Sequence, residues 1–179
     1  MDLYVDEQWV KDASPAADCF FYLLGGAALL AGTSRQMCLD FCRQNRDLVT
    51  SCLPGSLMQI AQASDFILVL DLVTAHGGRR LYLPTRAQRF FTQTGLLVPE
   101  PTYMQWRSLA DVNGQIDIPS IWGLFLALRR AAIRLALGRN WTPEALHATF
   151  GVSRRQLKAY RPWAEPTGLA VSRLHSQPR

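Results

Sequence analysis

Few residues of this chain combine the types and the spacing that catalysis needs. The three histidines, His76, His147 and His175, fall in a predicted turn, helix and tail, and no GxSxG, Walker or HExxH motif occurs. The pair Gly77-Gly78 followed by Arg79-Arg80 has amides and guanidinium groups that suit a phosphate. It lacks the preceding strand and following lysine of a P-loop, and a tight turn is the commoner role of two glycines. The sequence therefore predicts a protein that is not an enzyme and has no catalytic residues.

The four cysteines could in principle hold a metal ion. Cys38 and Cys42 lie one helical turn apart, which offers two thiolates on one face. No CxxC pair is present and no histidine precedes His76, so a zinc site would have to recruit Cys19 and Cys52 from other parts of the chain. Buried thiols in a cytosolic protein are the interpretation we favour. We expect no metal site and no cofactor.

Charge is unevenly distributed along the chain. The 179 residues carry a net charge of +5 with a pI near 9.3, which favours a polyanionic partner. Residues 1–18 contain five acidic side chains against one lysine, whereas from residue 129 onward ten cationic side chains face two glutamates. At 18% charged residues, neither a coiled coil nor a disordered chain is indicated. The positive charge gathers near the C-terminal end.

The same composition bears on location. The N-terminus is acidic, so no signal peptide is predicted. The longest uncharged run, Cys19 to Ser34, is interrupted by three glycines and falls short of the roughly 20 apolar residues that cross a bilayer. We expect a cytoplasmic protein with no membrane partner.

Apolar periodicity predicts a mainly α protein with one or two short β-strands. Helices are expected over residues 14–31, 33–45, 56–75 and 120–137, with a further helix from near Arg86. A strand competes with the helix over 66–73, and residues 90–106 read as a loop with one short helix. Residues 81–83 read as a short strand, and a second strand-like passage lies within residues 113–120.

The segment from Trp141 to Tyr160 has the features of a helix-turn-helix. Thr142 and Pro143 suit the start of a helix, and Gly151 suits its end because glycine readily adopts a positive φ. Ser153 then suits the start of a second helix. An ordinary αα-hairpin with a solvated basic face is the alternative. The spacing of Leu146, Gly151, Val152 and Ser153 favours a DNA-binding unit, although His147 stands where alanine is usual.

The second helix, predicted over residues 153–161, would enter the major groove. Arginine and glutamine make paired hydrogen bonds to guanine and adenine edges, which places Arg154, Arg155 and Gln156 nearest the bases. Other groups are assigned mainly to phosphates. The complete set of expected DNA-binding residues is Arg139, Thr142, Ser153, Arg154, Arg155, Gln156, Lys158, Tyr160 and Arg161.

The two strand-like passages resemble each other. Each has a turn pair, alternating apolar residues, a proline and a hydroxyl residue, as in Leu81-Tyr82-Leu83-Pro84-Thr85 and Ile116-Asp117-Ile118-Pro119-Ser120. They could pair as a ribbon within one chain, or each could pair with a copy in a second subunit. Chance similarity between strand-to-helix junctions is the alternative. The residues expected to contribute to dimerisation are Leu81, Tyr82, Leu83, Ile116 and Ile118.

The first of these passages and the helix-turn-helix, taken together, resemble the Mor/C family of transcription activators from Mu-like phages. The matching residues in and before the first passage are Ile67 to His76, Gly77, Gly78, Tyr82, Leu83 and Pro84. The matching residues in and around the helix-turn-helix are Gly138, Arg139, Asn140, Phe150, Gly151, Val152, Lys158, Ala159 and Arg161. Several dozen residues separate Pro84 from the helix-turn-helix, where the family has a short connection. The resemblance implies a homodimer that binds double-stranded DNA and contacts RNA polymerase.

The sequence as a whole predicts three regions and one function. Residues 1–119 would form a dimerisation or interaction region, 120–163 the DNA-binding domain, and 164–179 a flexible basic tail. The expected function is a dimeric, sequence-specific transcription regulator, most simply an activator. The alternative is a non-enzymatic adaptor of a multi-protein assembly such as a secretion or conjugation apparatus, which the apolar N-terminal segment and the tryptophans favour.

Overall fold

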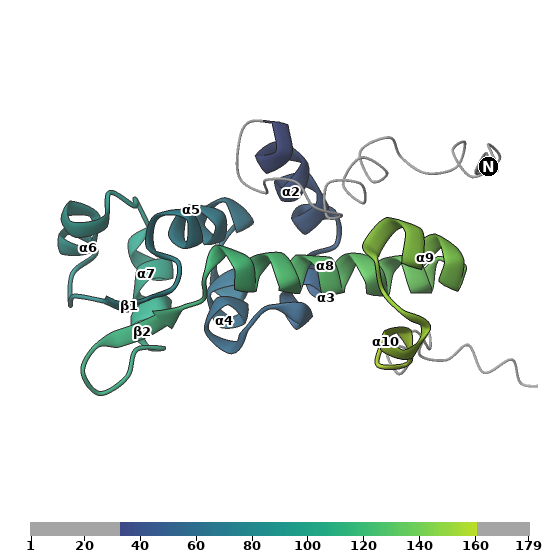
Figure 1. The fold of residues 1–179 in the computed structure, drawn as a ribbon. Coiled ribbons are helices and arrows are strands. Elements are labelled where there is room, and N and C mark those ends of the chain that lie inside the picture. Colours follow the sequence, from purple (N-terminus) through teal and green to yellow (C-terminus); the bar gives the residue numbers. More distant parts are fainter. Residues whose placement is uncertain (1–32, 161–179) are drawn as a thin grey trace, which may run out of the picture. The chain divides into compact units, whose positions relative to one another are not determined.

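The computed structural model describes residues 33–160 (Figure 1). The predicted helix over 14–31, Arg161 and the predicted tail lie outside the described residues. Within them the chain is mainly α-helical with one two-stranded antiparallel sheet, which confirms the predicted fold class. The chain divides into two compact units, Met1–Ala132 and Ile133–Arg179. The boundary between the two units falls inside the helix that spans Ile121–Gly138. No helix in the described range is long and apolar enough to cross a membrane.

In the described part of the first unit, the chain starts with two helices in close succession. Helix α2 spans Thr33–Gln44 and helix α3 spans Arg46–Cys52. The Asn45 backbone N–H bonds to the carbonyl of Phe41 at 3.0 Å, and its side-chain amide bonds to the same oxygen. Helix α2 buries Cys38, Phe41 and Cys42 at the i, i+3, i+4 spacing of an amphipathic helix. The second helix was not predicted.

The helix predicted over residues 56–75 is two helices, and that prediction is wrong. Helix α4 spans Gly55–Ala63 and α5 spans Phe66–His76. Asp65 ends the continuity, because its carboxylate accepts a hydrogen bond from the Ile67 N–H at 2.9 Å and caps α5. The apolar run from Phe66 onward is helical, so the competing strand does not form. Helix α4 contacts α3 and α5, and also the later helix Glu100–Arg107 and the strand Gln115–Ile118. It therefore lies at the centre of this unit.

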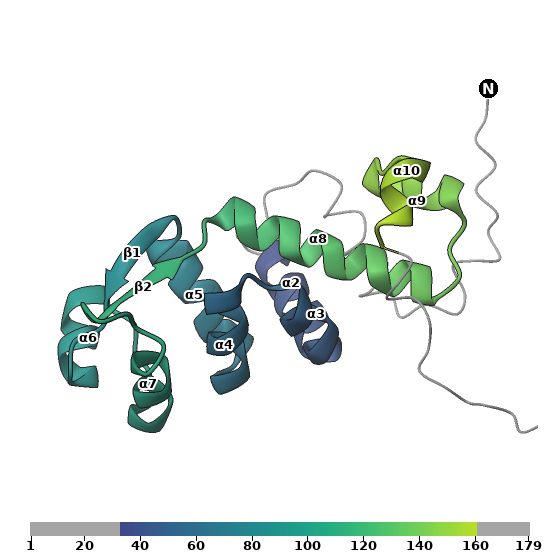
Figure 2. The same ribbon diagram turned by 90° about the horizontal axis from the view of Figure 1, so that it is seen from below.

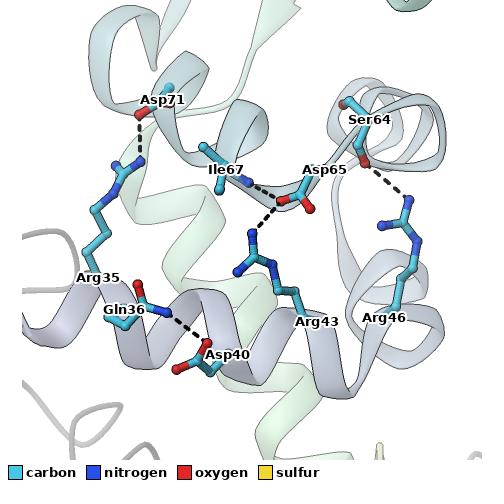
Figure 3. A network of polar contacts seen from close by, with 9 residues as sticks. All are labelled: Arg35, Gln36, Asp40, Arg43, Arg46, Ser64, Asp65, Ile67 and Asp71. Atoms are coloured by element: carbon cyan, nitrogen blue, oxygen red, sulfur yellow. Dashed lines mark hydrogen bonds and ion pairs between the residues drawn. The ribbon is translucent and has the colours of Figure 1, made fainter.

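Arginine side chains tie the first two helices to α4 and α5 (Figure 3). Arg35 pairs with Asp71 at 2.7 Å, and Arg43 pairs with the capping residue Asp65 at 3.3 Å. Arg46 donates to the carbonyls of Ala61 and Ser64 at the end of α4, at 2.7 and 3.1 Å. These bonds satisfy carbonyls that the helix end leaves without intrahelical donors.

The two strands pair with each other within one chain, which resolves the alternative that the sequence left open. Strand β1 spans Arg79–Tyr82 and β2 spans Gln115–Ile118, with Leu81 opposite Ile116. Figure 2 shows the two strands side by side. One face of this ribbon is exposed and carries Arg80, which binds both Asp111 at 2.7 Å and Asp117 at 3.1 Å. The opposite face carries the buried residues Leu83, Ile116 and Ile118.

Two short helices connect the strands: one begins close to the helix predicted from near Arg86, and the other overlaps the passage 90–106 that was predicted as a loop with one short helix. Helix α6 spans Ala87–Thr94 and α7 spans Glu100–Arg107. Between them Gly95 takes a φ of 72°, a left-handed conformation that ends α6. The fully buried rings of Phe90 and Tyr103 lie 5.1 Å apart, with Trp106 edge-on to Phe90. The Tyr103 hydroxyl donates to the carbonyl of Pro84 and so joins α7 to the end of β1.

Helix α8 spans Ile121–Gly138, close to its predicted bounds, and crosses from the first unit into the second. Its N-terminus is capped by Ser120, whose hydroxyl accepts from the Gly123 N–H at 3.1 Å. Its C-terminus is a Schellman motif: Trp141 N–H bonds to the carbonyl of Ala136, and Asn140 takes a φ of 59°. Helix α9 (Pro143–Phe150) and helix α10 (Arg154–Lys158) follow.

Candidate nucleic-acid interface

Helix α9 begins and ends at the residues that its sequence predicts. The Thr142 hydroxyl accepts a hydrogen bond from the Ala145 N–H at 3.2 Å, and Pro143 takes the first helical position. Gly151 has a φ of 63° and its N–H bonds to the carbonyl of His147, which ends the helix. No atom lies within 4 Å of a Cβ built on Gly151, so the glycine serves the backbone conformation and not a close approach.

The turn after α9 is compact. Val152 is buried, and its carbonyl lies 3.2 Å from Nδ1 of His147. Because a carbonyl can only accept, the imidazole N–H donates to it. His147, which stands where alanine is usual in such units, therefore packs against the turn through a polar contact rather than entering the helix interface. Its side chain is exposed.

Helix α10 starts with a complete capping box. The Ser153 hydroxyl accepts from the Gln156 N–H at 3.3 Å, and the Gln156 side-chain oxygen accepts from the Ser153 N–H at 2.8 Å. The helix ends at Lys158, and Tyr160 N–H then bonds to the carbonyl of Leu157, three residues earlier. It is shorter than the predicted range of 153–161 over the residues that the structure describes.

A small apolar core holds the helices of this unit. Leu146 and Phe150 on α9, Val152 in the turn and Leu157 on α10 are all buried. The Phe150 and Trp141 rings lie 6.4 Å apart. Each helix thus buries one apolar side and leaves its polar side in solvent, which is the pattern of an amphipathic helix in a helical unit.

The exposed side of this unit is cationic. Residues 133–160 contain five arginine or lysine residues and one carboxylate, that of Glu144. Arg139, Arg155 and Lys158 are exposed, and Tyr160 is half-buried. Arg139 follows the end of α8, and its N–H bonds to the carbonyls of Leu135 and Ala136. An exposed cationic surface of this kind attracts the phosphates of a nucleic acid.

The one carboxylate of this surface is engaged by a predicted base-reading residue. Arg154 pairs with Glu144 at 2.7 Å, and both side chains are exposed. Glu144 lies in the first turn of α9, where a hydrogen bond from its own backbone N–H, together with Arg154, lowers the pKa of its carboxyl below the usual range. The carboxyl of Glu144 is therefore charged at neutral pH and available to Arg154. Sequence reasoning missed this pairing, because the two residues are ten positions apart on different helices.

Apart from Arg154, which pairs with Glu144, and Tyr160, which is half-buried, the predicted DNA-binding residues that the structure describes fall into two groups. Thr142, Ser153 and Gln156 have their oxygens engaged in capping helices, so their side chains maintain the unit. Arg139, Arg155 and Lys158 extend into solvent. Arg161 lies outside the described residues.

The predicted dimerisation residues also divide. Leu83, Ile116 and Ile118 are 1%, 5% and 3% exposed, so their side chains pack within the chain and cannot meet a second subunit. Leu81 is half-buried and Tyr82 is 51% exposed. The burial follows from the pairing of β1 with β2, because Ile116 and Ile118 alternate onto the inner face of the ribbon.

The cysteines that the structure describes, Cys38, Cys42 and Cys52, are buried and free of disulfides. A hydrogen bond with Cys38 and burial raise the pKa of the Cys42 thiol well above its usual value. Among residues 33–160, no group of histidine, cysteine, aspartate and glutamate side chains is placed to hold a metal ion. Cys19 lies outside that range.

Comparisons of the chain with models of protein families, with curated proteins and with solved structures find no match.

Proposed function

We propose that the protein is a sequence-specific DNA-binding regulator of transcription that inserts α10 into the major groove. The observation that supports this most directly is that one set of α10 residues holds the helix in place while another set is exposed to solvent. Ser153 and Gln156 hold its N-terminus and Leu157 anchors it in the core, while Arg155 and Lys158 remain exposed beside the turn. A short helix fixed at its start and cationic on its outer side suits entry into a groove lined with phosphates.

In this proposal the exposed cations make different contacts with DNA. Arg155 lies in the first turn of α10, and the N-terminal residues of a recognition helix contact base edges. Its guanidinium suits the paired acceptors of guanine. Lys158 and Arg139 lie at the ends of their helices and are assigned to phosphates. Gln156 is reassigned from base reading to helix capping.

The wider proposal includes a homodimer, activation of transcription through contact with RNA polymerase, and a cytoplasmic location. The resemblance to the Mor/C activators supports the first two, and the distribution of charge supports an anionic partner. Leu81 and Tyr82 are the predicted dimerisation residues that retain exposed surface.

Titration of the purified full chain with DNA tests the proposal. Fragments covering the region upstream of its own gene are compared with shuffled fragments of the same composition, at several salt concentrations. Preference for one fragment that persists as salt rises supports a specific reader, since nonspecific binding is dominated by release of counterions. Equal, salt-sensitive binding to every fragment contradicts it. Absence of binding together with a stably co-purifying protein supports the adaptor instead.

A further inference from the structure

The first half of α8 is apolar on two faces. Leu124, Ala127, Leu128 and Ala131 are buried at the i, i+3, i+4, i+7 spacing of one helical face. A second stripe is not covered: Trp122 is 65% exposed and Leu126 is 39% exposed. A helix that is apolar around most of its circumference is normally covered around most of it.

The side chains of this exposed stripe lie next to one another on one side of α8. The rings of Trp122 and Phe125 stack at 5.0 Å, and Leu126 lies one turn after Trp122 on the same side. Ile121, beside Trp122, is 44% exposed. We call these four residues, Ile121, Trp122, Phe125 and Leu126, the α8 stripe. Single exposed apolar residues need no explanation, whereas a contiguous aromatic and aliphatic set marks a binding surface.

We propose that residues 19–31 of the same chain pack on the α8 stripe. This segment reads CFFYLLGGAALLA and contains no charged or strongly polar side chain. Left in water it would expose several large apolar groups, so it needs a surface to cover. It precedes α2, which begins at Thr33, and α2 belongs to the same compact unit as residues 121–132. The segment is thus tethered at a high effective concentration, which a separate partner does not have.

Charge supports the same placement. Residues 1–18, which precede the segment, carry five acidic side chains and one lysine. On α8 the stripe is followed by Arg130, whose side chain is exposed. A chain whose apolar part covers the stripe can bring its acidic part towards this cation, which favours this occupant over one of unknown charge.

Oxidative footprinting of the full-length protein tests the proposal. Hydroxyl radicals oxidise exposed tryptophan, so Trp122 is expected to react slowly in the wild type and at least about threefold faster when Leu23 and Leu24 are changed to aspartate, since each aspartate opposes burial of the segment. Leu97→Asp is the matched control, because Leu97 is 76% exposed in the same unit and lies between α6 and α7 rather than on α8. Equal rates of Trp122 oxidation in the wild type and the Leu23→Asp/Leu24→Asp variant overturn the proposal.

A reciprocal measurement separates a cis segment from a second copy. Backbone hydrogen exchange of residues 19–31 is expected to be slowed in the wild type and to speed up in Trp122→Ser, a substitution at an exposed position that leaves the core in place. Protection that is the same at about 1 and about 100 μM protein indicates an intramolecular contact. Protection that grows with concentration identifies a second chain as the occupant and overturns the proposal, as does unprotected exchange in the wild type.

Discussion

The side-chain oxygen of Gln156 accepts a hydrogen bond from the backbone N–H of Ser153 at 2.8 Å, while the Ser153 hydroxyl accepts from the backbone N–H of Gln156 at 3.3 Å. Each residue therefore supplies a side-chain acceptor for the backbone N–H of the other at the start of α10. Ser153→Ala is expected to lower the free energy of unfolding by about 1 kcal/mol, because an N–H of the first turn loses its acceptor. Urea denaturation measures this, and Ser153→Asp, which keeps an acceptor, should remain close to the wild type.

The exposed cations of α10 should affect DNA binding in different ways. Arg155→Ala is expected to weaken binding to the preferred fragment by about 1–3 kcal/mol and to reduce the preference itself, because a base contact is lost. Lys158→Ala should weaken binding to all fragments alike and reduce the salt slope by about 1. Fluorescence anisotropy at several salt concentrations distinguishes the two. Equal loss of specificity in both variants would contradict the assigned roles.

Removal of the carboxylate at position 144 should strengthen DNA binding. Glu144→Gln frees Arg154 from its ion pair and removes the one negative side chain of residues 133–160, so the affinity should rise and the salt slope steepen by about 1. The lowered pKa of Glu144 means that the charged form favours the folded state above its usual titration range, and that this contribution is lost as pH falls through the lowered value. The wild type should accordingly approach the affinity of Glu144→Gln in acid, whereas the variant should not show this component.

Two substitutions of Asp65 can separate the contribution of its helix-capping hydrogen bond from that of its ion pair. Asp65→Ala is expected to destabilise the protein by about 1 kcal/mol, because the Ile67 N–H loses its acceptor at the start of α5. Asp65→Asn keeps a good capping side chain and loses only the exposed pair with Arg43, which contributes little. Thermal and urea unfolding of both variants measure the difference. A cost as large in Asp65→Asn as in Asp65→Ala would show that the ion pair matters more.

Tyr103 should make the stability sensitive to alkaline pH. Burial raises the pKa of its hydroxyl from 10.0 to about 12, so the folded protein holds the neutral form after the unfolded chain begins to ionise. The contribution of this raised pKa to the free energy of unfolding is complete below pH 10 and is lost as pH rises towards 12. Tyr103→Phe should remove this alkaline loss and cost about 1–3 kcal/mol at neutral pH, because the Pro84 carbonyl loses its donor. Tyr82→Phe, at an exposed position, is the control in the same denaturant series.

Local signals predicted the second unit well and the first unit incompletely. Thr142, Pro143, Gly151 and Ser153 each act through their own backbone environment, so their types alone locate the ends of α9 and α10. The break between α4 and α5 was missed because the apolar periodicity continues across it. Asp65 carried the signal, since aspartate is a preferred N-cap and lies directly before the apolar run.

The partner of strand β1 and the role of Gln156 could not be predicted from the sequence for a different reason. The hydrogen bonds of β1 would be satisfied equally by β2 or by a strand of another chain, so only the burial of Ile116 and Ile118 within the unit decides between them. The type of Gln156 permits base reading and capping alike. Its position three residues after Ser153 is the signal for capping, and it outweighs the chemistry of the amide.

The ribbon of β1 and β2 also has a consequence for the order in which the chain assembles. The N–H of Leu83 and the carbonyl of Gly114 are joined by a hydrogen bond of 2.8 Å, and the chain segment between these two residues contains both α6 and α7. Closing a loop of this length before its interior is ordered carries an entropic cost, whereas the nearby rings of Phe90 and Tyr103 can meet early. Helices α6 and α7 should therefore form first and shorten the distance that the two strands must span, so the ribbon is a late product of folding rather than its nucleus.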